Sequence, residues 1–132
     1  MARYVIDAGT LLHLLDHDLP LDPDHQLVAP NGIRSEALQL LLDDVALGLR
    51  DEKSALALHE RMTELKIRLL GDRVSRGNAW KIARKSGISI RDAEYLAVTR
   101  LQADALVTVD AGLAAQAADV VPVAPVEALL VK

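Results

Sequence analysis

The runs Tyr4-Val5-Ile6-Asp7 and Ala105-Leu106-Val107-Thr108-Val109-Asp110 decide the fold, because each is a short apolar segment that ends in an aspartate. Both are rich in β-branched residues, which is typical of strands buried on both faces. In open α/β sheets, ligands bind just beyond the carboxyl ends of the strands, so Asp7 and Asp110 are predicted to approach one point. Carboxylates in one partly buried pocket repel each other unless a hard cation joins them. The pattern therefore raises the question of a Mg²⁺ or Mn²⁺ site.

The segments around these two runs predict an α/β fold with a mostly parallel central sheet and helices on both of its faces. Short strand patterns alternate with amphipathic helical patterns, which is the arrangement that produces parallel sheets. Gly87 is expected to end one helix as a C-cap, and Pro122 marks the last strand as an edge strand because proline cannot donate a hydrogen bond. The expected strands are 3–7, 27–29, 67–70, 105–109 and 120–123, and the expected helices are 10–17, 33–49, 54–65, 73–86, 89–102 and 112–118.

Composition narrows the class of protein. The chain has 132 residues, of which 51% are hydrophobic, so we expect one folded domain over residues 1–132. It has no cysteine, which excludes disulfides and thiolate metal sites. The start of the sequence shows no apolar signal segment, and no apolar run has membrane-spanning length, so we expect a cytoplasmic protein.

The net charge of −4 conceals a strong local asymmetry. Residues 66–91 contain eight basic residues and one acidic residue, whereas the rest of the chain contains 7 basic and 18 acidic residues. A basic segment on an acidic protein favours contact with a polyanion. The alternative is a solvated helix face with no partner.

Two further acids stand where a metal site needs them. Glu36 and Asp92 each fall in the first turn of an expected helix, where the helix dipole stabilises the anionic form of a carboxylate. Each candidate also has a purely structural interpretation. Glu36 could be an ordinary first-turn acid, Asp92 could close a capping box with Ser89, and Asp110 could be a helix N-cap.

Four short segments together resemble the PIN domain, and their order and spacing are most similar to the VapC-type toxins of toxin–antitoxin pairs. The resemblance extends over essentially the whole chain, and it implies a PIN-like three-layer fold. The segments are 4–12 (YVIDAGTLL), 29–38 (APNGIRSEAL), 89–97 (SIRDAEYLA) and 106–110 (LVTVD).

The resemblance implies a metal-dependent endoribonuclease that uses Mg²⁺ or Mn²⁺. Asp7, Glu36, Asp92 and Asp110 would form the catalytic, metal-binding set, and Thr10 and Thr108 would position a ligand, water or phosphate. Family members often carry the first hydroxyl nearer the first aspartate than Thr10 is to Asp7. The implied partners are RNA, a cognate antitoxin protein and a second copy of the chain in a homodimer. The residues expected to hold the RNA backbone are Arg73, Arg76, Lys81, Arg84 and Lys85.

The chemistry fits on independent grounds. Hydrolysis of a phosphodiester needs a nucleophilic water and stabilisation of the leaving oxygen, and a carboxylate-bound Mg²⁺ can supply both. No covalent nucleophile is required, and the sequence has no good candidate. Trp80, in the basic segment, could stack on a base, but the sequence favours a packing residue at a helix or dimer contact.

Other classes of protein fit less well. A receiver-type phosphoacceptor domain needs a pair of adjacent acids after its first strand, and Asp7 stands alone. A haloacid-dehalogenase-type phosphatase needs Asp-x-Asp-x-Thr, and Gly9 stands in place of the second acid. His13 and His17 are four residues apart on a helix, but no third zinc ligand accompanies them. The stronger alternative keeps the fold and changes the role, to an RNA-processing nuclease or a non-catalytic domain that binds RNA or a partner.

Overall fold

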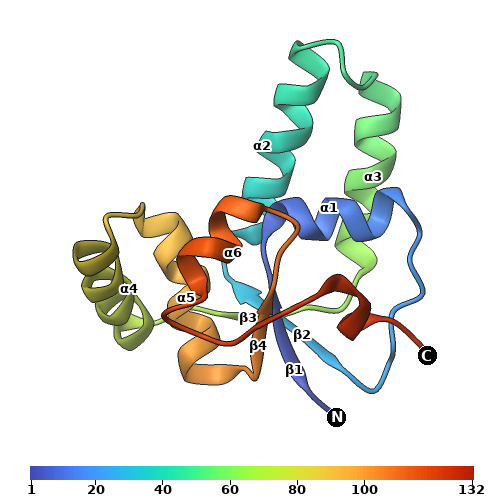
Figure 1. Ribbon diagram of the computed structural model, residues 1–132. Coiled ribbons are helices and arrows are strands. Elements are labelled where there is room, and N and C mark those ends of the chain that lie inside the picture. Colours follow the sequence, from blue (N-terminus) through green and yellow to red (C-terminus); the bar gives the residue numbers. More distant parts are fainter.

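The computed structural model describes residues 1–132, and it has a five-stranded sheet at its centre (Figure 1). The strand order is β3-β2-β1-β4-β5, and every neighbouring pair is parallel. This arrangement confirms the predicted fold class. In chain order the elements are β1 (Arg3–Ile6), α1 (Ala8–Asp16), β2 (Gln26–Pro30), α2 (Ile33–Ala46), α3 (Glu52–Glu64), β3 (Arg68–Leu70), α4 (Arg73–Ser86), α5 (Ile90–Gln102), β4 (Ala105–Val107), α6 (Ala111–Ala117), β5 (Val123–Ala124) and the 3₁₀ helix η1 (Val126–Leu129).

Helices lie on both sides of the sheet, which gives three layers (Figure 1). On one side α5 packs against β1, β2 and β4, and α4 packs against α5. On the other side α1, α2 and α3 pack against one another. Because both faces of the sheet are covered, the central strands are apolar throughout, and Val5, Ile6, Val28 and Leu106 have no exposed surface.

The helices α2 and α3 form a hairpin that stands out from the body of the protein (Figure 1). We call residues 33–64 the helical hairpin. Its buried residues are few, and several of its leucines are exposed to solvent. The most exposed are Leu42, Leu47, Leu49 and Leu56.

Several element boundaries differ from the sequence prediction, and each difference has a local cause. Helix α1 begins at Ala8 rather than Thr10, because Asp7 itself is the N-cap. Helix α3 begins at Glu52 rather than at residue 54, because Asp51 is the N-cap and accepts a hydrogen bond from the amide of Ser54 at 2.6 Å. Strand β4 ends at Val107 because the next residues turn toward the end of β1.

Other predicted features are confirmed. Gly87 ends α4 in the left-handed conformation, with φ of 72°, and β5 is an edge strand of the sheet. None of the helices combines the length and the apolar character that crossing a membrane requires.

Candidate functional site

Asp7 lies at the carboxyl end of β1 and is almost fully buried, with 8% of its surface exposed. One carboxylate oxygen, Oδ1, accepts hydrogen bonds from the amide and the hydroxyl of Thr10, and the other accepts one from Thr108 Oγ1 at 3.0 Å. Burial raises the pKa of Asp7 above its usual range, although these hydrogen bonds partly oppose the rise. No lysine or arginine forms an ion pair with Asp7.

The two threonines join the end of β1 to the loop after β4. Thr10 Oγ1 also accepts a hydrogen bond from the amide of Val109 at 3.0 Å, and Thr108 Oγ1 accepts one from the amide of Asp110 at 3.0 Å. Each hydroxyl therefore holds the Asp7 carboxylate on one side and the β4–α6 loop on the other. The three-residue spacing between Asp7 and Thr10 suits this role, because the first turn of α1 brings the hydroxyl back over its own N-cap.

Glu36 lies in the first turn of α2, just beyond the end of β2, and is half-buried. Its Oε2 accepts a hydrogen bond of 2.6 Å from the hydroxyl of Tyr95. Burial raises the pKa of Glu36, and the Tyr95 hydrogen bond and the nearby charge of Arg91 oppose that rise. The nearby charges of Asp7 and Asp92 also raise the pKa of Glu36.

Tyr95 is a site residue that the sequence analysis did not single out. It is buried, and burial together with the neighbouring Glu36 raises the pKa of its hydroxyl, so Tyr95 remains a hydrogen-bond donor. A signal for it was available in the sequence. Tyr95 follows Asp92 by three residues on α5, and residues at that spacing share a helix face.

Asp92 and Asp110 both lie at helix N-termini, but their side chains do different things. Ser89 caps α5 by accepting a hydrogen bond from the amide of Asp92 at 3.1 Å, and the Asp92 carboxylate makes no return bond to Ser89. The capping-box prediction is therefore right for Ser89 alone. Asp110 is exposed and caps α6, where its Oδ1 accepts from the amides of Gly112 and Leu113 at 2.8 and 3.2 Å.

The four acids lie at the carboxyl end of the sheet, but no three Asp, Glu, His or Cys side chains converge closely enough to hold a metal ion as they are placed. Their existing bonds explain this: Tyr95 holds Glu36, and the N-terminus of α6 holds one oxygen of Asp110. The donor set fits a hard divalent cation in its chemistry, since every donor is a carboxylate or hydroxyl oxygen. It also includes a buried carboxylate, Asp7, without a cationic partner.

A cleft of about 380 Å³ opens beside Glu36 and Tyr95. Its walls come from the first turns of α2 and α5, and Arg91 and Glu94 also line it. Arg91 is exposed and forms no ion pair, so the cleft combines carboxylates with a cation at its wall. A cation beside the carboxylates lowers the electrostatic repulsion that a phosphate group meets when it approaches them.

The five basic residues predicted to hold RNA are all on α4, which leads into α5 through residues 87–89. Each is exposed, and none forms an ion pair. Trp80 lies among them with 62% of its surface exposed, so the prediction that it packs at a helix contact is wrong for this chain, and the prediction of a dimer contact stays a prediction. The residues are Arg73, Arg76, Lys81, Arg84 and Lys85.

No protein-family model and no curated protein sequence matches this chain. Among solved structures, it is similar to PAE2754 from Pyrobaculum aerophilum, with a TM-score of 0.78 and 24% identity over 97% of this chain and 92% of that one. It is also similar to VapC20 from Mycobacterium tuberculosis, a sarcin–ricin loop cleaving toxin, with a TM-score of 0.63 and 20% identity over 92% of this chain and 99% of that one. The protein therefore has the PIN-like three-layer α/β fold, which it shares with PAE2754 and VapC20.

Proposed function

We propose that this protein is a Mg²⁺- or Mn²⁺-dependent endoribonuclease and the toxin of a type II toxin–antitoxin pair. The observation that carries the proposal is Asp7, a buried carboxylate at a strand end, held by two hydroxyls and lacking a cationic partner. Glu36, Asp92 and Asp110 follow neighbouring strand ends or begin the helices beside it. VapC20, which has the same fold, is a sarcin–ricin loop cleaving toxin, and this supports RNA as the substrate.

In this proposal Asp7, Glu36, Asp92 and Asp110 hold the metal ion, which when bound activates a water and stabilises charge on the leaving oxygen. Thr10 and Thr108 orient the Asp7 carboxylate, and Tyr95 orients Glu36. Because metal binding needs ionised carboxylates, the raised pKa values of Asp7 and Glu36 make activity fall as the pH is lowered. The unpaired cations of α4 and Arg91 hold the phosphates.

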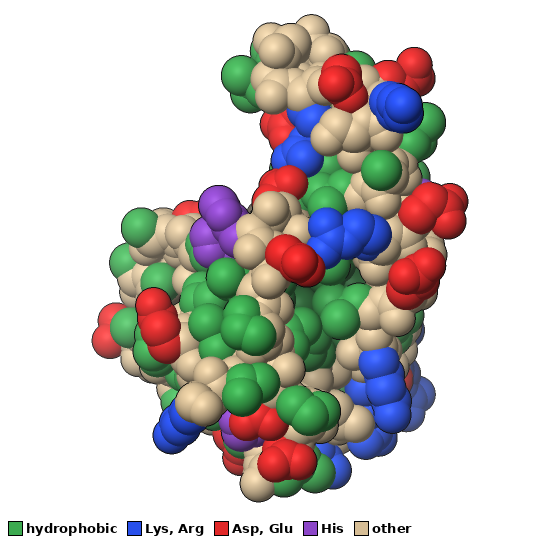
Figure 2. All heavy atoms as spheres, turned by 90° about the vertical axis from the view of Figure 1, so that its right-hand side faces the viewer, with side chains coloured by type: hydrophobic (Ala, Val, Ile, Leu, Met, Phe, Trp, Pro, Cys, Tyr) green, Lys and Arg blue, Asp and Glu red, His purple; other side chains and the backbone are tan.

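A protein partner and a homodimer belong to the same proposal. The helical hairpin exposes Leu42, Leu47, Leu49 and Leu56 on a part of the chain that projects from the sheet. Figure 2 shows the side of the molecule with α3, where further apolar side chains gather below the hairpin. Exposed apolar surface of this extent marks interaction sites in soluble proteins, and an antitoxin or a second copy would cover it. Action on cellular RNA would place the protein in the cytoplasm.

The test is cleavage of a mixed RNA pool by the purified protein with Mg²⁺, with Mn²⁺ or with EDTA, beside Asp7→Asn. We expect cutting with either metal and none with EDTA or in the variant. Asp24→Asn is the matched control, because Asp24 is an exposed aspartate on the loop that enters β2 at the opposite end of the sheet. Full activity in Asp7→Asn would refute the assignment.

Two further outcomes separate the remaining alternatives. RNA binding without cutting under any metal would favour a non-catalytic RNA-binding domain. If cutting is observed, expression in bacteria distinguishes a toxin from a processing nuclease. If the protein is a toxin, expression of the wild type arrests growth and expression of Asp7→Asn does not.

A further inference from the structure

Trp80 is the only tryptophan in the chain, and it is displayed on the outer face of α4 rather than packed in the core. The opposite face of α4 carries Ser75, Ala79 and Ile82, which are buried. A large aromatic side chain left 62% exposed keeps much apolar surface in water, which is unfavourable unless something covers it. No other aromatic ring contacts Trp80.

Cations surround Trp80 at helical spacing. Arg76 lies four residues before it and Arg84 four residues after it, so each neighbours the indole along the helix surface. Arg73 belongs to the same stripe, one turn further from the centre of the helix. Gly77, three residues before Trp80, has no side chain, and a Cβ there would meet nothing within 4 Å. The indole is therefore open on that side.

The charge of α4 decides which kind of partner fits. The helix contains no acidic residue, and its N-cap Asp72 is engaged in a capping box with Ser75. A second copy of this chain docked through the same face would bring Arg73, Arg76 and Arg84 of one copy against the same residues of the other, which is repulsive. A partner with regular negative charges and flat aromatic groups fits both features, and single-stranded nucleic acid has that chemistry.

The position of α4 relative to α5 indicates the direction in which a bound strand would run. The helix ends at Ser86, about 9 Å along its axis from Trp80. After three intervening residues α5 begins, with Arg91 and Asp92 in its first turn. Arg91 lines the cleft that also contains Glu36. A strand that lies along α4 is thus led from Trp80 toward the acidic cleft.

We propose that Trp80 is a stacking platform for an unpaired base of single-stranded RNA, with Arg76 and Arg84 binding the phosphates on either side of that base. The inference rests on the proposed function, since RNA is the ligand in both. It adds a specific contact: the RNA must be unpaired a few nucleotides from the bond that is cut, so a fully paired duplex is a poor ligand.

The single tryptophan makes the contact directly observable. Stacking of a base on the indole quenches its fluorescence, and Asp7→Asn provides a protein in which bound RNA stays intact. We expect strong quenching by a single-stranded RNA oligonucleotide of mixed sequence and weak quenching by the same strand in a duplex. Heparin, a polyanion without bases, should bind without comparable quenching.

Variants test the contribution to affinity. Because stacking contributes substantially per base, Trp80→Ala in the Asp7→Asn background should weaken single-stranded RNA binding by about 10-fold or more, and Trp80→Phe should recover part of it. Val74→Ala is the matched control, because Val74 is 58% exposed on the same helix but lies away from the stripe. Thermal unfolding of each variant should match the parent, since Trp80 is not part of the core.

The outcomes separate this inference from the proposed nuclease. If the wild type cuts RNA but Trp80→Ala binds and cuts equally well, the stacking contact is wrong and the nuclease stands. If RNA quenches Trp80 and no metal supports cutting, the contact stands and the nuclease is wrong. If Trp80→Ala changes the sedimentation coefficient but not RNA binding, Trp80 is a protein contact and the inference is overturned.

Discussion

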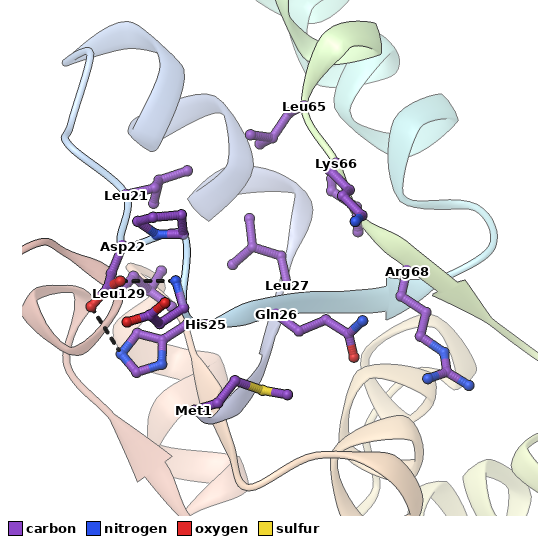
Figure 3. A pocket seen from close by; sticks show the side chains of 13 residues that line it. Met1, Leu21, Asp22, His25, Gln26, Leu27, Leu65, Lys66, Arg68 and Leu129 are labelled. Carbon is purple, nitrogen blue, oxygen red and sulfur yellow. Dashed lines mark hydrogen bonds and ion pairs between the residues drawn. The ribbon is translucent and has the colours of Figure 1, made fainter.

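The two ends of the sheet differ in a way that cavity size does not reveal. A pocket of about 860 Å³ lies at the end opposite the acidic residues, where β2 and β3 begin (Figure 3). Two polar groups of this pocket, the His25 imidazole and the Asp22 carboxylate, have partners within the protein. His25 Nδ1 accepts a hydrogen bond from the amide of Ala2 at 3.2 Å, and His25 Nε2 lies 3.7 Å from Asp22 Oδ2. The carboxyl end has a cleft of less than half that volume, but the buried Asp7 at that end and Glu36, which lines the cleft, both have raised pKa values and form no ion pair. Uncompensated charge, rather than volume, identifies the end of the sheet where chemistry is expected.

The strongest test of this comparison is Asp7→Asn, for which we expect opposite changes in activity and stability. Loss of a residue that orients a metal ligand costs about 10- to 100-fold in activity. Cleavage by Asp7→Asn should fall by more than that, because Asp7 is itself a proposed ligand. Burial raises the pKa of Asp7, so its protonated form favours folding, and this stabilisation is lost as the pH rises through the folded-state pKa. The metal-free variant should therefore melt at a higher temperature than the wild type at neutral pH.

Thermal unfolding with and without Mg²⁺ measures both effects of the Asp7 substitution. Added Mg²⁺ should raise the melting temperature of the wild type and leave that of Asp7→Asn unchanged. Asn is also a good N-cap, so α1 should persist in the variant. A variant that melts below the metal-free wild type at neutral pH would show that Asp7 is a structural residue.

The second test is Thr108→Val, which keeps the side-chain shape and removes two hydrogen bonds, to Asp7 and to the amide of Asp110. We expect cleavage to fall by about 10- to 100-fold and the Mg²⁺ concentration for half-maximal activity to rise, because the Asp7 carboxylate loses its orientation. Thr63→Val is the control, since Thr63 is exposed on α3 and bonds only to a backbone carbonyl there. Unchanged Mg²⁺ dependence in Thr108→Val would argue against a positioning role.

The third test is Tyr95→Phe, which removes the hydrogen bond that stabilises the anionic form of Glu36. The pKa of Glu36 should rise further, so the acid limb of the pH–rate profile should move to higher pH. The loss of a hydrogen bond to a charged group should also cost about 1.5 kcal/mol of stability, measured by urea unfolding. Tyr4→Phe is the matched control, because Tyr4 lies at the other end of the sheet, packed edge-on against His25. An equal shift of the profile in both variants would contradict this assignment.

The smallest effect is expected from His25→Ala, in the large pocket. The variant should lose about 0.5–1.5 kcal/mol of stability with its hydrogen bond to the amide of Ala2, and RNA cleavage should stay at the wild-type rate. Denaturant unfolding and the RNA assay, run on the same preparation, measure the two quantities. A large loss of cleavage at unchanged stability would show that both ends of the sheet take part in function.

The sequence could predict the strands, the parallel sheet and the positions of the acids, because each depends on local pattern. Val5, Ile6 and Leu106 are apolar in short runs, and the polar residue that follows such a run must leave the sheet at its end. Asp92 could be placed in the first turn of α5 because Ser89 is a capping residue, and Glu36 could be placed in that of α2 because the turn residues 30–32 precede the helix.

What the sequence could not predict depends on contacts between distant residues. The bond between Tyr95 and Glu36 joins positions 59 apart, and the bond between Thr108 and Asp7 joins positions 101 apart. Helical periodicity shows that a residue faces the core, but it does not show which side chain it meets there. Trp80 illustrates the converse, because its apolar character suggested packing and only the fold shows that its face of α4 is uncovered.

The hydrogen bonds of Thr10 and Thr108 also determine when the site is assembled during synthesis of the chain. Asp7 is translated 101 residues before its partner Thr108, Thr10 precedes its partner Val109 by a similar interval, and β1 pairs with β4 only after both strands have been made. Contacts of such long sequence separation form late in folding. A chain that is still being synthesised therefore carries its first acid without the loop that orients it, and the site is assembled only after β4 and that loop have been translated.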